Sequence, residues 1–200
     1  ACLERAARVP VMRGLAETLK ADQPETLRNT MTLGDLLVER DPQSLTLTLL
    51  LALGATIRRA DVGMHLTMAS WLSAEEDVAR ALIADVSVPL GAVQAAVAVE
   101  KVARTPADAP IVAAVAYVEL GEGDQPAYTA LALCGADRYP VRQPEVERVL
   151  DETGDIERAL EVLAVDPPSD HWGSREYRAA MARITARRAL TAAIAQARAA

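Results

Sequence analysis

The chain has 200 residues, 51% of them hydrophobic and 3% aromatic, and it carries a formal net charge of −7. This length indicates one domain or two small ones, with a core large enough to need no metal or disulfide. An acidic chain with few aromatic side chains argues against nucleic acid as a partner. No apolar run approaches the roughly 20 residues that cross a bilayer, and no secretory leader is recognised, so we expect no membrane span.

The cysteines and histidines are too few and too scattered to indicate a metal site. Cys2 and Cys134 stand far apart and outside any CxxC pattern, as is typical of reduced thiols in a cytoplasmic protein. Two thiolates are too few for an iron–sulfur cluster, which needs about four. His65 and His171 are isolated, so we expect no metal ion, and we expect a cytoplasmic location.

The first third of the chain shows helical patterns and one hairpin. Residues 11–20 carry apolar side chains at helical spacing, and residues 45–53 form an apolar run that ends at Gly54. We interpret the second run as a buried helix, with a strand as the alternative. Residues 57–68 alternate around a turn at 61–63, which predicts a β-hairpin.

Four apolar segments with strand-like alternation follow in the middle of the chain. They span residues 83–89, 93–104, 109–120 and 128–136, and turn-forming residues separate them. The third segment is apolar on both faces, so we expect it at the centre of a sheet. Short connections between the segments predict that the four strands form an antiparallel sheet.

The last third of the chain is predicted to be helical. Helices are expected over 144–152, 155–164 and 174–200, the last two capped by Asp155 and Ser174. The helical phase slips near residues 187 and 188, which indicates a kink or a division, and three side chains are expected to face inward: Tyr177, Met181 and Ile184. The element order predicts an α+β fold, an antiparallel sheet packed against C-terminal helices, with a domain boundary near residue 75.

The common catalytic motifs are missing from the sequence. No serine lies in a nucleophile-elbow pattern, and there is neither a GxGxxG nor a GxxxxGK[ST] segment. We therefore predict no catalytic residue from the motifs themselves.

Four segments, in order and at matching spacing, resemble a known family. They are "LRNTMTLGDLLVERDPQSLTLTLLLALGATI", "LIADVSVP", "VEKVARTPADAPIVAAVA" and "WGSREYRAAMARITARRAL". Together they are similar to the FAD-binding medium subunit of molybdenum hydroxylases, the family of xanthine dehydrogenase and carbon monoxide dehydrogenase flavoproteins. The resemblance implies a partial FAD-binding domain over 1–75 and the family's C-terminal domain over 76–200. It also implies electron transfer through FAD beside a molybdenum-cofactor subunit and an iron–sulfur subunit.

The resemblance assigns five candidate flavin-binding residues. Thr32 and Gly34 match the start of the family's Thr-Ile-Gly-Gly-Asn turn, and Asp35 stands at its second glycine. Ile83 falls at a Leu position that precedes a strand end, and Lys101 falls at the family's flavin-side lysine. Glycine in such a turn lets the backbone approach a pyrophosphate and donate N–H groups to it.

Other positions depart from the family pattern. Leu36 replaces the Asn of the turn, Leu45 replaces an Asp that contacts flavin, and the N-terminal Gly-rich segment has no counterpart. A negative charge on Asp35 about 4 Å from a pyrophosphate costs about 1 kcal/mol in water and more where it is partly buried. We therefore expect FAD binding by the isolated chain to be weak or absent.

Simpler interpretations of the same residues stay open. Thr32 can be the N-cap of a short helix with Asp35 in its first turn, and Lys101 can be a solvated strand end. Two functional hypotheses follow. In one, the chain is an electron-transfer subunit whose FAD site is completed by other residues. In the other, it is a non-catalytic interaction or assembly module of the same kind of complex.

Overall fold

The computed structural model describes residues 10–22, 25–75, 81–92, 94–106 and 108–200. Cys2 lies outside these ranges, whereas Cys134 is a buried free cysteine, and burial raises the pKa of its thiol to about 12. Within the described ranges, no helix is both long and apolar enough to cross a membrane.

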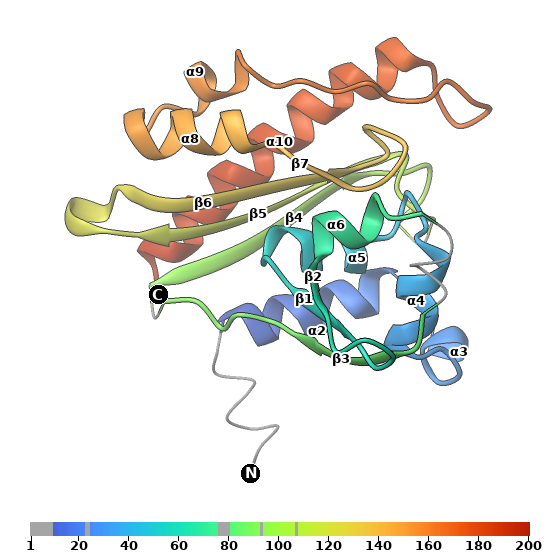
Figure 1. Cartoon of the computed structure of the whole chain (residues 1–200). Helices are drawn as coiled ribbons and strands as arrows, with labels where there is room; N and C mark the ends of the chain where they lie inside the picture. The colour runs from blue at the N-terminus through green and yellow to red at the C-terminus, as the bar shows by residue number, and fades with distance from the viewer. Residues whose placement is uncertain (1–9, 23–24, 76–80, 93, 107) are drawn as a thin grey trace.

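Two antiparallel sheets form the framework of the molecule (Figure 1). The small sheet has the strand order β2-β1-β3, and the large sheet has the order β4-β5-β6-β7. The small sheet consists of β1 (Thr56–Arg59), β2 (His65–Thr67) and β3 (Ile83–Ser87), and the large one of β4 (Ala95–Val102), β5 (Val112–Leu120), β6 (Pro126–Cys134) and β7 (Val141–Arg142).

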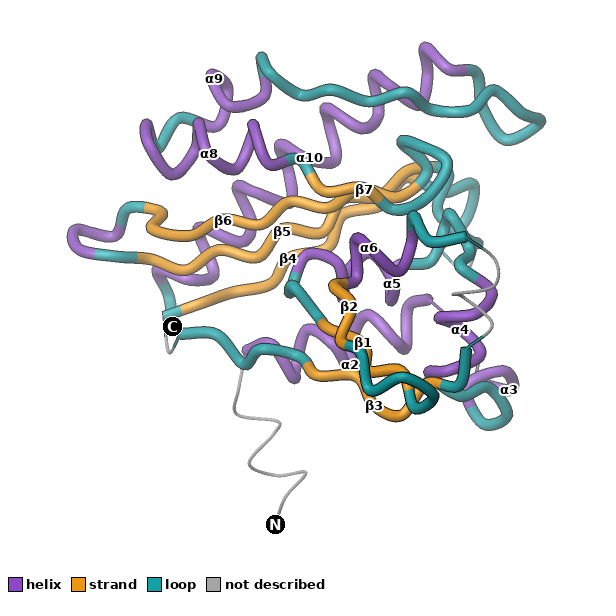
Figure 2. Tube along the Cα trace, in the orientation of Figure 1, coloured by secondary structure: helices purple, strands orange, loops and turns teal. Residues whose placement is uncertain are grey.

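Helices cover both faces of the large sheet (Figure 2). The N-terminal group lies between the two sheets or beside the small one, and the C-terminal group lies on the opposite face of the large sheet. The N-terminal group contains α2 (Pro10–Asp22), α3 (Glu25–Arg28), α4 (Leu33–Glu39), α5 (Leu45–Ala52) and α6 (Met68–Leu72). The C-terminal group contains α8 (Pro144–Thr153), α9 (Ile156–Leu160) and α10 (Arg175–Arg198). A 3-10 turn, η1 (Glu122–Asp124), joins β5 to β6.

The predicted α+β architecture is confirmed: a sheet of three long antiparallel strands and the short β7 packs against the C-terminal helices. β5 lies between β4 and β6, and its side chains alternate between two cores. Ala114, Ala116 and Val118 face α10, whereas Val115 and Tyr117 face α5. Because helices bury both faces, β5 is apolar on both faces from Val112 to Val118, as its sequence predicted.

The segment 83–89, predicted as a strand of the same sheet, belongs instead to the small sheet. β3 pairs antiparallel with β1, so that Val86 lies opposite Ile57. Alternation in a sequence shows which face of a strand is buried, but it does not identify the partner strand. β3 lies after residue 75, yet it pairs with β1, which lies before that residue. The division of the chain into two domains at residue 75 therefore stays a prediction.

The helix α10 is unbroken across residues 187 and 188, so the predicted division is wrong. Its buried face also differs from the prediction. Tyr177 is 41% exposed, whereas Met181 is partly buried against the core, as predicted. The fully buried face consists mainly of small side chains such as Ala182 and Ala186, together with Leu190 near the end of the helix. An alanine-rich helix can pack closely on a sheet without a stripe of large apolar residues, which is why periodicity of large side chains misplaced this face.

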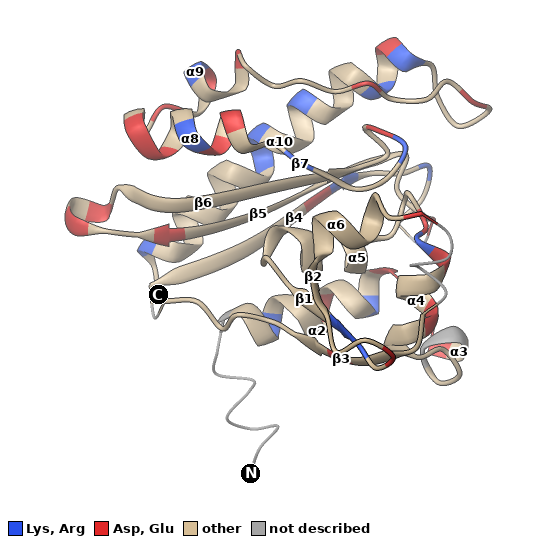
Figure 3. Cartoon of the chain, in the orientation of Figure 1, with Lys and Arg blue, Asp and Glu red and all other residues tan. Residues whose placement is uncertain are grey.

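Charged side chains of both signs line the helical layer of α8, α9 and α10 (Figure 3). Within α8, Arg148 pairs with Glu145 and Glu152 at 3.1 and 2.8 Å. Between helices, Arg187 of α10 donates from Nη2 to Glu157 of α9 at 2.7 Å. All of these side chains are at least 43% exposed, so each pair adds little to the stability of the fold.

A buried arginine fixes the start of α10 to the end of the large sheet. The Arg178 side chain is 1% exposed and donates from Nη1 to the carbonyl of Ile111 at 2.5 Å and to that of Gly135 at 3.3 Å. Its Nη2 donates to both carboxylate oxygens of Asp170 at 2.8 Å. The pairing lowers the pKa of Asp170. The backbone has no room beside this contact: a Cβ built on Gly135 would lie 2.1 Å from the Ile111 carbonyl oxygen.

We expect Gly135→Ala to destabilise the fold by at least about 2 kcal/mol, because it combines a left-handed backbone (φ +69°) with a steric clash. Gly63→Ala is the matched control, since Gly63 has φ +63° but no atom within 4 Å of a built Cβ. Its cost should be only the backbone strain of about 1 kcal/mol. Urea unfolding of both variants measures the difference, and equal costs would contradict the steric account.

Candidate functional site

The first candidate residues form a closed capping box at the start of α4. Thr32 is the N-cap, and its Oγ1 accepts a hydrogen bond from the backbone N–H of Asp35 at 3.2 Å. In return, Asp35 Oδ2 accepts from the backbone N–H of Thr32 at 2.7 Å and from its hydroxyl at 2.8 Å. The interpretation of Thr32 as an N-cap is confirmed.

The carboxylate of Asp35 is held in its ionised form by this box. Hydrogen bonds from the Thr32 backbone and then from the Thr32 hydroxyl lower the pKa of Asp35. Gly34 leaves space beside it, because a Cβ built there would meet only Thr32 Oγ1, at 3.5 Å. The backbone N–H groups of Thr32 and Asp35 are therefore already hydrogen-bonded within the chain, and the negative charge of the Asp35 carboxylate lies next to them.

The start of α5, which lies nearby, is capped in part by a residue that is distant in the sequence. Ser44 is the N-cap of α5, and its Oγ accepts from Leu47 N at 3.2 Å. The carboxylate of Asp22, at the end of α2, accepts from Ser44 Oγ and Leu45 N, each at 2.8 Å, and from Thr46 N at 3.0 Å. No local pattern marked Asp22, because its partners are 22 to 24 residues away.

The other two candidate residues lie apart from the capping box. Ile83 stands in β3 opposite Arg59 and packs against the core shared by α5 and the small sheet. Lys101 stands near the end of β4, and its Nζ donates to the backbone carbonyls of Pro106 at 2.9 Å and Asp108 at 3.4 Å. Over the described residues, no hydrogen bond or ion pair joins either of them to Thr32 or Asp35.

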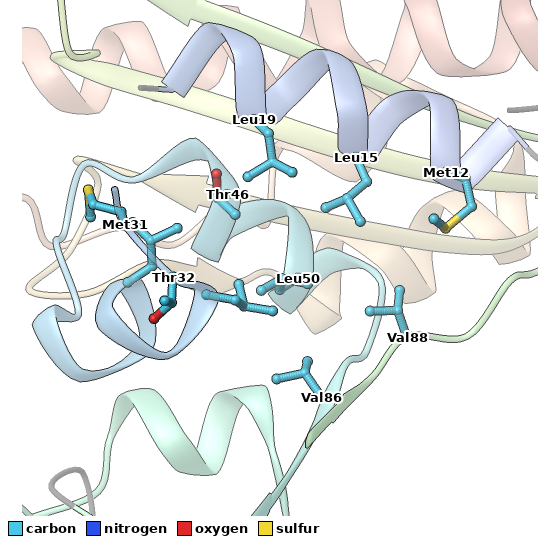
Figure 4. Close-up of a pocket in the computed structure, with 11 residues that line it drawn as sticks. Met12, Leu15, Leu19, Met31, Thr32, Thr46, Leu50, Val86 and Val88 are labelled. Atoms are coloured by element: carbon cyan, nitrogen blue, oxygen red, sulfur yellow. The ribbon is translucent and has the colours of Figure 1, made fainter. Parts of the chain in front are cut away.

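A pocket of about 540 Å³, here called the α2–β3 pocket, opens beside the capping box. Figure 4 shows side chains from α2, α4, α5 and the β3 segment pointing into it. Its lining is almost entirely apolar and includes Leu15 and Leu19 of α2, Leu33 of α4, Leu50 of α5, and Val86 and Val88. Thr32 lies at its edge and is the candidate residue that reaches it. Sequence patterns did not predict this pocket, because its walls come from segments up to 76 residues apart, Met12 and Val88 being the extremes.

We expect Thr32→Ala to cost about 1 kcal/mol of stability through loss of the N-cap. Asp35→Asn should also destabilise the chain, and this loss should depend on pH. Because the folded pKa of Asp35 is lowered, its contribution is present above the unfolded value of about 3.9 and disappears as pH falls through the folded pKa. Unfolding curves of wild type and Asp35→Asn should therefore differ at pH 7 and converge in acid. A difference that does not change with pH would argue against the carboxylate as the cause.

No protein-family model matches the chain, and neither does any curated protein sequence. Solved structures do match. A chain of the reconstituted CO dehydrogenase from Oligotropha carboxidovorans is 24% identical, with a TM-score of 0.78, over 95% of this chain and 69% of that one. A chain of carbon monoxide dehydrogenase from Hydrogenophaga pseudoflava is 23% identical, with a TM-score of 0.83, over 94% of this chain and 68% of that one. A chain of quinoline 2-oxidoreductase from Pseudomonas putida 86 is 22% identical, with a TM-score of 0.80, over 96% of this chain and 69% of that one. Over nearly its whole length this chain has the fold of these oxidoreductase chains, so the resemblance to molybdenum hydroxylases is confirmed at the level of the fold.

Proposed function

We propose that the chain is a subunit of a cytoplasmic oxidoreductase complex of the molybdenum hydroxylase type, built on the fold of the FAD-binding, electron-transferring subunit. Its partners are a molybdenum-cofactor subunit and an iron–sulfur subunit. The observation that carries the proposal is the fold match, which extends over 94–96% of the chain in two carbon monoxide dehydrogenases and a quinoline oxidoreductase. In this chain, we propose further, the flavin site is not completed by the chain's own residues.

The start of α4 does not fit a pyrophosphate. The Asp35 carboxylate already accepts from the backbone N–H and the hydroxyl of Thr32, and its charge would repel a second anion at the same place. The helix has only seven residues, so its dipole offers limited compensation. Gly34 alone retains the open approach that a phosphate requires.

Two further positions have lost the polar groups that a flavin would use. Leu36 is 5% exposed, and Leu45 is fully buried against Ala113 and Cys134. The N–H groups of Leu45 and Thr46 donate to Asp22, so the start of α5 already holds an anionic group. The described residues therefore do not fit FAD by themselves, and we derive no electron-transfer step through them.

The same observations support a second candidate function, a non-catalytic assembly module of such a complex. Lys101, the proposed flavin-side cation, hydrogen-bonds two loop carbonyls, and the two helix starts are capped internally. An assembly module needs only its surfaces, whereas an electron-transfer subunit needs further residues from another polypeptide to hold FAD.

We expect the purified chain to show no flavin absorption bands and to leave FAD fluorescence unchanged in a titration. Asp35→Gly should behave in the same way, because removing one charge restores neither the polar groups lost at 36 and 45 nor the N–H groups taken by Asp22. Tight FAD binding by the wild-type chain would refute the account of the site, and binding gained only by Asp35→Gly would show that this carboxylate alone excludes the cofactor.

The complex itself is tested by affinity purification of the tagged chain from its native host. We expect subunits that contain molybdenum cofactor and iron–sulfur clusters to be recovered with it, as detected by metal analysis and mass spectrometry. If flavin is recovered in the complex but not with the isolated chain, the electron-transfer function is favoured. If the complex forms and contains no flavin, the assembly function is favoured. Recovery of the chain alone would contradict both.

A further inference from the structure

The α2–β3 pocket lies beside a strand edge without a partner. In the small sheet β1 is central, so each of β2 and β3 has a second edge, and no described strand pairs with that of β3. Such an edge presents backbone N–H and C=O groups that another extended segment can pair with. Figure 4 shows the side chains of Val86 and Val88 directed into the pocket, with the helix α2 opposite them.

From this juxtaposition we propose that the β3 edge and the α2–β3 pocket together form a docking site for an extended polypeptide segment, which adds a strand to the small sheet. The proposal deepens the proposed function by locating where an outside polypeptide joins the chain, and it rests on that function only for the source of the segment. When a segment adds a strand to a sheet, its main-chain hydrogen bonds provide affinity. Pockets that receive every second side chain of the segment provide specificity.

The chemistry of the two faces of β3 defines the occupant. On the pocket side lie Val86 and Val88, with Leu33 and Leu50 as further walls. On the opposite face Asp85 pairs with Arg58 of β1, and both side chains are more than 40% exposed. A strand that continues this sheet should therefore alternate, with apolar side chains toward the pocket and polar ones toward solvent.

The surroundings of the site indicate a protein partner. Leu33 lines the pocket and is 40% exposed, and two apolar residues that flank β3 in the sequence are also exposed, Leu82 to 73% and Leu90 to 52%. Exposed apolar side chains that cluster around one groove often mark a protein–protein interaction site. Thr46 also lines the pocket, and its buried hydroxyl has no hydrogen-bond partner among the described residues, whereas Thr32 uses its hydroxyl in the capping box. The occupant should therefore offer a polar group at Thr46, which the backbone of a polypeptide segment can supply.

The comparisons give a source for the segment. The solved oxidoreductase chains are longer than this one, and close to a third of each has no counterpart in it. A polypeptide similar to part of that third, whether in a separate subunit or in a longer chain, is the occupant that we propose. A second copy of this chain, pairing β3 with β3, is the competing occupant that the experiment must separate.

The test uses overlapping fluorescent peptides that span the part of the Hydrogenophaga pseudoflava chain without a counterpart here, together with scrambled versions and the whole fragment co-expressed with the chain. Binding is measured by anisotropy, without flavin or other subunits. At least one peptide of alternating pattern should bind, and it should slow the amide hydrogen exchange of residues 83–87. The assay contains neither flavin nor the other subunits, so its result does not depend on whether the proposed complex forms. Likewise, the absence of peptide binding would not show that the complex fails to form.

Two substitutions in α4 make the matched comparison. Leu33→Glu places a carboxylate in the pocket wall at a helix start, where it does not harm the helix, and should weaken peptide binding at least tenfold. Val38→Glu changes an equally exposed apolar residue of the same helix that does not line the pocket, and should leave binding unchanged. Equal effects of the two changes, binding of scrambled peptides, or no binding by any peptide or by the fragment would overturn the proposal. Dimers that protect residues 83–87 without peptide would assign the site to a second copy instead.

Discussion

The complete burial of α5 is the constraint on which the arrangement of the N-terminal half depends. All eight residues of this helix are buried between the large sheet, α2 and α6. A buried helix start leaves N–H groups that water cannot reach, so the protein must supply their acceptors. Ser44 and the carboxylate of Asp22 supply them. This requirement places the end of α2 at the start of α5.

The position of α2 then determines the pocket. With its end fixed by Asp22, the helix crosses β4 so closely that a Cβ built on Gly14 would lie 2.9 Å from that of Val97. The apolar side of α2 beyond this contact faces β3 rather than the large sheet, and the space between them is the α2–β3 pocket. The same carboxylate that stabilises α5 also takes up N–H groups that an anionic cofactor would otherwise approach. Under the proposed function, this internal capping is one of the reasons why the chain's own residues would not complete a flavin site.

The large sheet and its C-terminal helices form a second, more self-contained part of the core. Alternate residues of β5 serve the two cores, and Arg178 ties α10 to the ends of β5 and β6. Two cations at this end of the sheet have partners within the chain: Lys101 donates to two loop carbonyls, and Arg104 is stacked 4.0 Å from the centroid of the Trp172 ring. An assembly role would rest on surfaces such as the β3 edge, since Asp22, Asp35 and Lys101 already have partners within the chain.

The sequence by itself determined the features that depend on near neighbours. The Thr32–Asp35 capping box joins residues three positions apart, the buried helix α5 ends just before Leu53 and Gly54, and the hairpin turns at 61–63, so local patterns were sufficient for each. The burial of β5 on both faces also followed from its apolar run from Val112 to Val118. Only the tertiary structure decided that β3 pairs with β1, that Asp22 caps a helix 22 residues away, and that alanines form most of the buried face of α10. These depend on which distant segments meet, and neither residue periodicity nor capping preference carries that information, because both act within a few residues along the chain.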